Sequence, residues 1–546
     1  MTFLLSFIKR YRAESICFTI FILLAVFGFC VHEPWYDEAQ AWQIAKTASL
    51  HDILWVIPSY EGHPPFWHLL LTVPAKLGVP WQWAFLLVGM GFVLVNGFLL
   101  FFKAPFPRWV RCMLPFNYFL LYQYGIIVRP YSAILLIMLL LAIYFPQKNQ
   151  RPFLFISLLA ALCACHIFGI AIAGGITMAW LWEIKAQQSW EIYLKQLFKD
   201  KRFYGMLGLL AFVIFLFALL WPQDDGLLAD YLNYTEHLFK HISFIIFGVP
   251  AEAVLTNLTD SVFIQQENLP WKNLLVTCLL GAGLWSLLWV CFTKKRILYL
   301  LLPVGLMSVV MIHYCSRHHI GLFLIIVIWY AWITLAENPI PPNLPRAIQQ
   351  FAKVVLLLIL IIPIGWTCYS LSMDYRYKIF PGDELVAFLK KHDLMKENIF
   401  ATWVVKKEGR TVAIPNPNMQ PISVLFNMYT PHNIIANFND RQDRGYLINQ
   451  ALMSTNQSLE IFQKWRKKGM PMVLLGPAPV SLIYEDSAVN QFYKAAFITK
   501  TNLLWKFNPP VTDEFVIYLH TDLWKKLANP SVTDIVFGNS PQKVGT

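Results

Sequence analysis

Two adjacent carboxylates are the residues of this sequence best suited to chemistry. Asp37 and Glu38 stand in the stretch 32–68, among six Trp and Tyr residues, a density typical of a membrane interface. Apolar surroundings raise the pKa of a carboxyl group and make it a general base near neutral pH. Neighbouring residues on a helix point about 100° apart, so the two acids would have different roles. The plainer interpretation is a solvated surface pair.

A second polar group follows within the same stretch, as Glu61, Gly62, His63 and the Pro-Pro pair at 64–65. Proline stiffens the backbone and glycine permits a tight approach, so His63 would be held in a fixed direction. His63 and the carboxylates could hold a divalent metal, although the spacing identifies no particular ion. The alternative is a structural turn into the next helix.

Basic residues at two further places could bind a phosphate. Arg129 occurs in YGIIVRPY near the end of an apolar run, and Arg317 and His318 begin another such run. An arginine at a membrane boundary is costly to keep, which favours a functional role, and its guanidinium can bind phosphate through two parallel hydrogen bonds. Snorkelling to lipid headgroups is the alternative. His166, between two short apolar runs, could face the same site or simply pack between helices.

Together these residues predict a reaction. A carboxylate base would deprotonate a hydroxyl group while cationic side chains stabilise a departing phosphate. A sugar linked to a polyprenyl phosphate would place its leaving group at the height of the membrane surface. Because phosphate leaves without a general acid, one base suffices for a single inverting displacement, unlike the two-carboxylate scheme of a retaining glycosidase.

The composition predicts a polytopic α-helical membrane protein. Of 546 residues, 57% are hydrophobic and only 14% are charged, against about 25% charged in soluble proteins. The net charge of +12 falls in short clusters between apolar runs, which indicates membrane topology and not nucleic-acid binding. The nine Cys lie in or beside apolar runs, so no disulfide or cysteine metal site is expected.

About eleven spans are expected at roughly 20 residues each, a little fewer for sheltered helices. The first is an uncleaved signal anchor, because its apolar run ends without a cleavage site. The segment 64–78 is too short to cross and is expected to lie in the interface. The expected spans are 16–31, 82–102, 110–127, 131–146, 152–165, 166–182, 204–221, 273–292, 297–314, 318–335 and 354–373.

The charges between spans set the orientation. Lys and Arg gather in alternate loops, which places the N-terminus in the cytoplasm and the loop 32–81 outside. Residues 222–272 form a second external loop with a half-buried helix near 241–254. We expect a transmembrane domain over 1–373 and a soluble, extracytoplasmic α/β domain over 374–546, with helices at 384–392 and 458–468 and strands at 398–405 and 471–475.

The motifs YDEAQAW (36–42), EGHPPFWHLLL (61–71) and YGIIVRPYS (124–132) resemble, in that order, those of the GT-C superfamily of integral membrane glycosyltransferases. The nearest likeness is to bacterial protein O-mannosyltransferase and aminoarabinose transferase-like proteins. That resemblance implies a polyprenyl-phosphate sugar donor, Asp37 as base, Glu38 as its acidic companion, and a bacterial inner-membrane location. It covers about residues 1–182 and leaves the acceptor open among a glycan, a lipid and a protein.

Two other functions stay open on the sequence alone. An oligosaccharide ligase or polymerase with a lipid pyrophosphate donor would need more cationic groups and a larger acceptor groove. A transporter or flippase would usually show repeated, interrupted helices, and the sequence has no internal repeat. The carboxylates also lie in a loop and not in the middle of a span, which favours catalysis.

Overall fold

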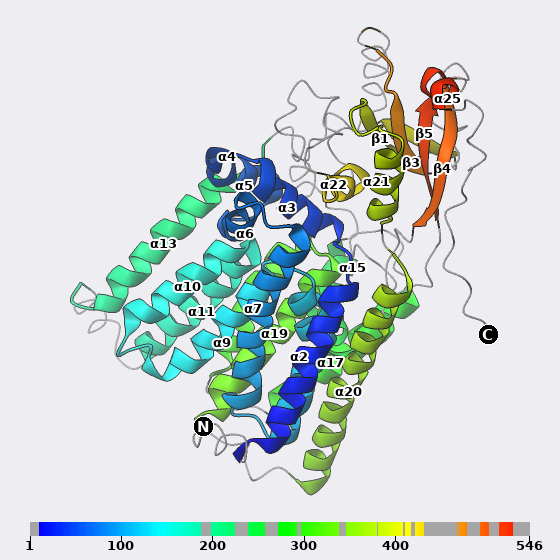
Figure 1. Ribbon diagram of the computed structural model, residues 1–546. Coiled ribbons are helices and arrows are strands. Elements are labelled where there is room, and N and C mark those ends of the chain that lie inside the picture. The colour runs from blue at the N-terminus through cyan, green and yellow to red at the C-terminus, as the bar shows by residue number, and fades with distance from the viewer. Residues whose placement is uncertain are drawn as a thin grey trace.

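The computed structural model (Figure 1) describes most of the chain, with several gaps. The described residues are 10–186, 198–223, 238–256, 271–291, 296–337, 345–378, 380–407, 410–415, 421–430, 467, 469–477, 492–501 and 513–527. Apolar helices form one bundle, and a smaller sheet lies beyond one end of it.

Seven helices in the described residues are long and apolar enough to cross a membrane. The chain is therefore a helical membrane protein. The seven are α2 (Arg12–Val31), α7 (Trp81–Phe102), α11 (Ile167–Ala186), α13 (Lys201–Leu219), α17 (Trp271–Cys291), α19 (Arg317–Leu335) and α20 (Arg346–Arg376). Three shorter apolar helices accompany them: α9 (Tyr131–Tyr144, extended to Gln147 by the 3-10 turn η3, Phe145–Gln147), α10 (Pro152–Cys165) and α18 (Leu298–His313). These ten helices coincide with predicted spans, while the total of eleven crossings stays a prediction.

The remaining predicted span, 110–127, is broken into three pieces. They are α8 (Arg108–Met113), the 3-10 turn η1 (Leu114–Phe116) and the π-helix η2 (Tyr118–Ile126). Pro115 cannot donate a backbone hydrogen bond, and the Asn117 side chain accepts one from Phe119 N at 2.9 Å, which starts a new helix there. All of η2 is buried, and such wide turns occur frequently at functional sites.

The predicted external loop 32–81 folds into four short helices, stacked on the sheet-facing end of the bundle (Figure 1). Gly62 ends α5 in the left-handed conformation, with φ 66°, where a side chain would be strained. The predicted interfacial segment 64–78 coincides with α6, one face of which is buried. The helices are α3 (Tyr36–Thr47), α4 (Leu50–Trp55), α5 (Ile57–Glu61) and α6 (Phe66–Lys76).

The predicted second external loop, 222–272, is described only at 222–223, 238–256 and 271–272. The expected half-buried helix near 241–254 coincides with α15 (Leu238–Ser243), η4 (Phe244–Gly248) and α16 (Val249–Leu255). The first six residues of α16 are buried, and the helix packs against α19.

The C-terminal region contains a mixed five-stranded sheet in the order β2-β1-β3-β5-β4, in which only β1 and β3 pair in parallel. The predicted helix 384–392 and strands 398–405 and 471–475 coincide with its elements. The predicted helix 458–468 falls almost wholly outside the described residues, and that this region is a soluble domain stays a prediction. The elements are β1 (Ile399–Lys407), β2 (Arg410–Pro415), β3 (Val473–Pro477), β4 (Tyr493–Thr501), β5 (Asp513–His520), α21 (Gly382–Lys391), α22 (Pro421–Asn427) and α25 (Thr521–Leu527).

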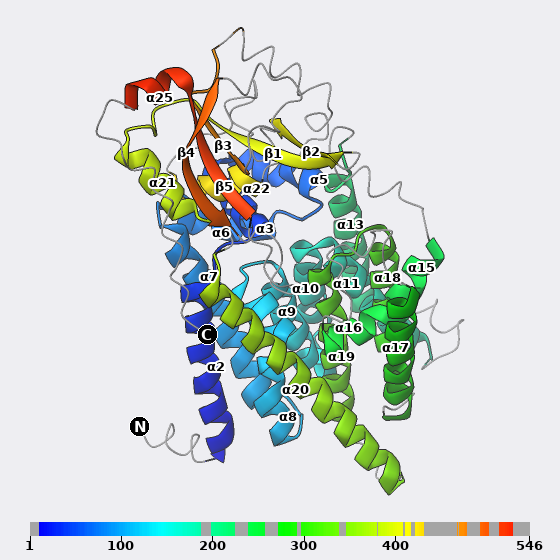
Figure 2. The ribbon, with the colours of Figure 1, turned by 90° about the vertical axis from the view of Figure 1, so that its right-hand side faces the viewer.

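The sheet region packs directly on α3 through α22 (Figure 2). Phe426 of α22 and Trp42 of α3 are buried in one hydrophobic cluster. The Lys46 ammonium group donates to Thr430 O at 2.6 Å, and Phe380 N donates to the Glu33 carboxylate at 3.1 Å. The C-terminal region is thus part of the support for α3.

Charged residues at the other end of the bundle form ion pairs. Glu14 accepts from Arg108 and Arg111 at 3.2 and 2.6 Å, and Lys148 pairs with Glu183 at 3.2 Å. The basic residues among them belong to loops that the charge pattern assigns to the cytoplasm. These ion pairs therefore lie at the end of the bundle opposite the sheet, although the side of the membrane stays a prediction.

Candidate functional site

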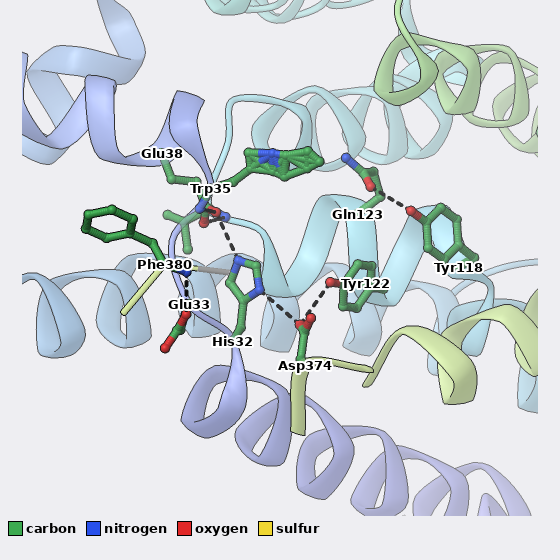
Figure 3. Close-up of polar contacts among 10 residues, drawn as sticks. His32, Glu33, Trp35, Glu38, Tyr118, Tyr122, Gln123, Asp374 and Phe380 are labelled. Carbon is green, nitrogen blue, oxygen red and sulfur yellow. Dashed lines mark hydrogen bonds and ion pairs between the residues drawn. The ribbon is translucent and has the colours of Figure 1, made fainter. Parts of the chain in front are cut away.

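Asp37 and Glu38 follow each other on α3 but have opposite surroundings. Glu38 is fully buried. One of its oxygens accepts from Trp35 N at 2.8 Å and contacts His32 Nε2 at 2.9 Å, and the other accepts from Val128 N at 2.7 Å (Figure 3). Burial raises the pKa of Glu38, but His32 and the backbone donors outweigh it and leave the pKa below its ordinary value. Glu38 is therefore a carboxylate whose two oxygens are both occupied.

His32 extends this network to the last transmembrane helix. Its Nδ1 lies 3.0 Å from the Asp374 carboxylate of α20, which also accepts from Tyr122 OH at 2.9 Å (Figure 3). A carboxylate faces each nitrogen of the imidazole, so the protonated ring can donate to both. The chain of contacts ties together α2, α3, α20 and η2. We call Glu38, His32, Asp374 and Tyr122 the Glu38 network.

Asp37 faces the other way and is 38% exposed at its side chain. Its carboxylate pairs with the buried Arg129 guanidinium at 2.6 Å. The same guanidinium nitrogen donates to His318 Nε2 at 3.3 Å, and its Cζ atom lies 5.2 Å from the Tyr131 ring centroid. The structure thus brings together three of the predicted site residues from three separate elements: the Asp37 carboxylate, the Arg129 guanidinium and the His318 imidazole.

Glu61 stands at the end of α5, beside the same site. It accepts a hydrogen bond from Gln40 of α3 at 2.6 Å. Burial, together with the negative charge of Asp37, raises the pKa of Glu61 to about 8. At neutral pH this side chain is therefore mostly a neutral carboxylic acid.

Four histidine rings pack in pairs near Arg129. The rings of His63 and His166 lie 4.2 Å apart between centroids, and those of His318 and His319 lie 4.1 Å apart. Burial, then His68 and Arg129, lower the pKa of His63 to about 3, so its ring is neutral. Among the described residues no three His, Cys, Asp or Glu side chains converge in a way that could hold a metal ion. The suggested metal site at His63 and the carboxylates is therefore not formed in the described part of the chain.

Arg317 lies in a different part of the site from its neighbour His318. It is buried at the first position of α19. The Tyr118 side chain of η2 interacts electrostatically with both Arg317 and Asp374. Arg317 therefore belongs on the side of the Glu38 network, whereas His318 contacts Arg129. Its predicted contact with a phosphate stays a prediction.

No residue pattern singles out His32 and Asp374. They are 342 residues apart, so no local spacing relates them. The only signal is an acid that follows the apolar run of the last span, where a charge is costly unless it is paired. Nothing in the sequence distinguishes His319 either, yet its ring lies against those of His166 and His318.

The fold and the site together define a helical membrane protein with a carboxylate, an arginine and a histidine cluster at the sheet-facing end of its bundle. No protein-family model matches the chain, and no curated protein and no solved structure matches it either. The likeness to the GT-C superfamily accordingly depends on the three motifs alone.

Proposed function

We propose that the protein is an integral membrane glycosyltransferase that moves a sugar from a polyprenyl phosphate donor to an acceptor on the outer face of a bacterial inner membrane. The observation that carries the proposal is the ion pair between Asp37 and Arg129, 2.6 Å long. It sets an accessible carboxylate against a buried cation at the end of an apolar bundle. A base for a hydroxyl and a partner for a phosphate are the two groups that this reaction needs.

In the proposed reaction the oxygen of an acceptor hydroxyl forms a bond to the anomeric carbon of the sugar. The bond between that carbon and the phosphate oxygen breaks, and its electron pair stays on the phosphate. The hydroxyl proton passes to the carboxylate of Asp37. Arg129 stabilises the additional negative charge on the departing phosphate. A single displacement of this kind inverts the anomeric configuration.

The neighbours of Asp37 support this division of roles. Both oxygens of Glu38 are occupied, one by His32 and Trp35 N and the other by Val128 N. We therefore assign Glu38 to the positioning of α3 and leave the base to Asp37. A neutral Glu61 keeps a second negative charge away from an incoming anionic donor. Arg129 contacts Asp37 through a single guanidinium nitrogen, and its other N–H groups can serve a phosphate.

Donor turnover in lipid nanodiscs tests the proposal. The purified protein is incubated with radiolabelled polyprenyl phosphate sugars and a cell-envelope extract, and release of label from the donor is followed. Asp37→Asn keeps the size of the side chain but removes the base, and should lower turnover by about 10²–10⁴-fold. No turnover by the wild type with any donor, or equal turnover by the variant, would overturn the proposal.

Asp393→Asn is the matched control. Asp393 is an exposed carboxylate in the C-terminal region that pairs only with its neighbour Lys396 among the contacts described. Asparagine also tolerates the positive φ of 54° at this position. Turnover by this variant should equal that of the wild type, which separates the loss of one particular carboxylate from the loss of negative charge in general.

A further inference from the structure

His319 has a defined tautomer and an unused donor. Its Nδ1 accepts a hydrogen bond from the backbone N–H of Ser316 at 3.0 Å, so a neutral ring must carry its hydrogen on Nε2. That Nε2 atom is buried and has no hydrogen-bond partner among the described residues. A buried donor without an acceptor costs about 1–3 kcal/mol, so its retention calls for an acceptor beyond those that the described residues supply.

The tautomer of His166 is fixed in the same way, and it leaves the Tyr131 hydroxyl group as a second hydrogen-bond donor. Its Nδ1 accepts from Phe168 N at 3.2 Å, which leaves the hydrogen on Nε2, 3.2 Å from the Tyr131 hydroxyl oxygen. The hydroxyl oxygen is then the acceptor of this contact. The hydroxyl hydrogen of Tyr131, a fully buried residue, stays available for another acceptor.

These donors lie together beside Arg129. The ring centroids of Tyr131 and His319 are 6.0 Å apart, and the Cζ atom of Arg129 lies 5.2 Å from the Tyr131 ring centroid. One imidazole acceptor nearby, His318 Nε2, already takes a hydrogen bond from Arg129. We call Arg129, Tyr131 and His319 the donor cluster, because each offers N–H or O–H groups as hydrogen-bond donors.

We propose that the donor cluster is a binding site for the phosphate group of a lipid-linked phosphate, in which His319 Nε2 and Tyr131 OH each donate to a phosphate oxygen beside the Arg129 guanidinium. This inference rests on the proposed function and adds His319 and Tyr131 to the residues that bind the polyprenyl phosphate sugar. Three donors from two helices and a loop suit a group with several oxygens, and a charged acceptor forms the strongest hydrogen bonds with them.

Two substitutions at His319 separate binding from structure. His319→Gln can accept from Ser316 N and donate from its amide, as glutamine does in capping boxes. His319→Leu retains bulk and loses both functions. Tyr131→Phe removes only a hydroxyl group, and it keeps the test decisive if the leucine variant does not fold.

Binding is measured in nanodiscs by thermal shift and calorimetry, with geranyl phosphate as the probe. Geraniol, geranic acid and inorganic phosphate are the comparison ligands. The wild type should bind geranyl phosphate at least about tenfold more tightly than geraniol or geranic acid. Loss of one hydrogen bond to a charged group should weaken geranyl phosphate binding about 10–100-fold in His319→Leu and in Tyr131→Phe, and by less than about threefold in His319→Gln.

The comparison ligands identify what the cluster recognises. Binding of inorganic phosphate with the same dependence on His319 would support the site and show that the phosphate group alone suffices. Equal affinity of all variants for geranyl phosphate would overturn the proposal and leave His319 with a capping role. Tighter binding of geranic acid than of geranyl phosphate would also overturn it.

The two proposals can fail separately. If geranyl phosphate binds in a His319-dependent manner but no sugar is transferred from any donor, the proposed function fails and the phosphate site stands. If sugar is transferred and the KM of His319→Leu for the donor is unchanged, the phosphate site fails and the glycosyltransferase stands.

Discussion

The two polar groups on either side of α3 differ in what they leave unsatisfied. In the Glu38 network both oxygens of a buried carboxylate are used, by an imidazole and two backbone amides. On the other side Asp37 is half-exposed and the Nε2 atom of His319 has no acceptor among the described residues. Groups that are fully used hold a structure together, whereas unused ones can receive a ligand. Adjacent residues of one sequence motif thus serve different purposes.

The largest expected effect is the loss of Glu38. Glu38→Ala leaves His32 and the amides of Trp35 and Val128 without their acceptor. Breaking a buried charge pair of this kind should lower the free energy of unfolding by about 3–5 kcal/mol. Thermal unfolding in nanodiscs measures the loss.

Asp37→Asn is the comparison for that measurement. The side chain is exposed enough to be solvated, and asparagine keeps an oxygen acceptor for Arg129. Its stability loss should be much smaller than that of Glu38→Ala although its activity loss is larger. Equal stability losses would contradict the contrast between the two sides of α3.

A second effect concerns the pH dependence of stability through Glu61. Its pKa is about 8 in the folded protein against an ordinary value of 4.5. The folded state therefore binds the proton more tightly, and the free energy of unfolding falls as pH rises from about 4.5 to about 8. Glu61→Gln keeps the acceptor for Gln40 and should remove a drop on the order of 2–4 kcal/mol over that range.

Unfolding temperatures measured between pH 5 and pH 8.5 provide the check on Glu61. The wild type should lose stability across this interval, and Glu61→Gln should show a flatter profile. Asp393→Asn, at an exposed carboxylate, should follow the wild type. Parallel profiles for the wild type and Glu61→Gln would show that Glu61 does not hold a proton at neutral pH.

Sequence patterns could predict the parts of this fold that depend on local composition. The apolar runs placed ten helices, and the short run after Pro65 placed α6. The charge pattern grouped Asp37, Arg129 and His318 at one end, as the structure has them. Those inferences need only hydropathy and the alternation of loops across a membrane.

The rest depends on contacts that no local pattern contains. Residue spacing indicates that Asp37 and Glu38 point in different directions. Which of the two is buried depends on His32 and Asp374, because His32 contacts both Asp374 and Glu38. The break at Pro115 and Asn117 divides the predicted span 110–127 into α8, η1 and the π-helix η2. The tautomer of His319 depends on one backbone amide, which is visible only once the helix start is known.

The smallest predicted effect tests the far end of the Glu38 network. Tyr122→Phe removes one hydroxyl group, which donates to Asp374 at 2.9 Å, and leaves the packing of the ring intact. A hydrogen bond to a carboxylate contributes about 1.5–3 kcal/mol, so a loss of about 2 kcal/mol in the free energy of unfolding is expected. Tyr375→Phe, at an exposed tyrosine on the same helix as Asp374, is the control and should change nothing measurable. If instead Tyr122→Phe lowers donor affinity at unchanged stability, the network itself binds substrate, and the distinction between the two sides of α3 would have to be abandoned.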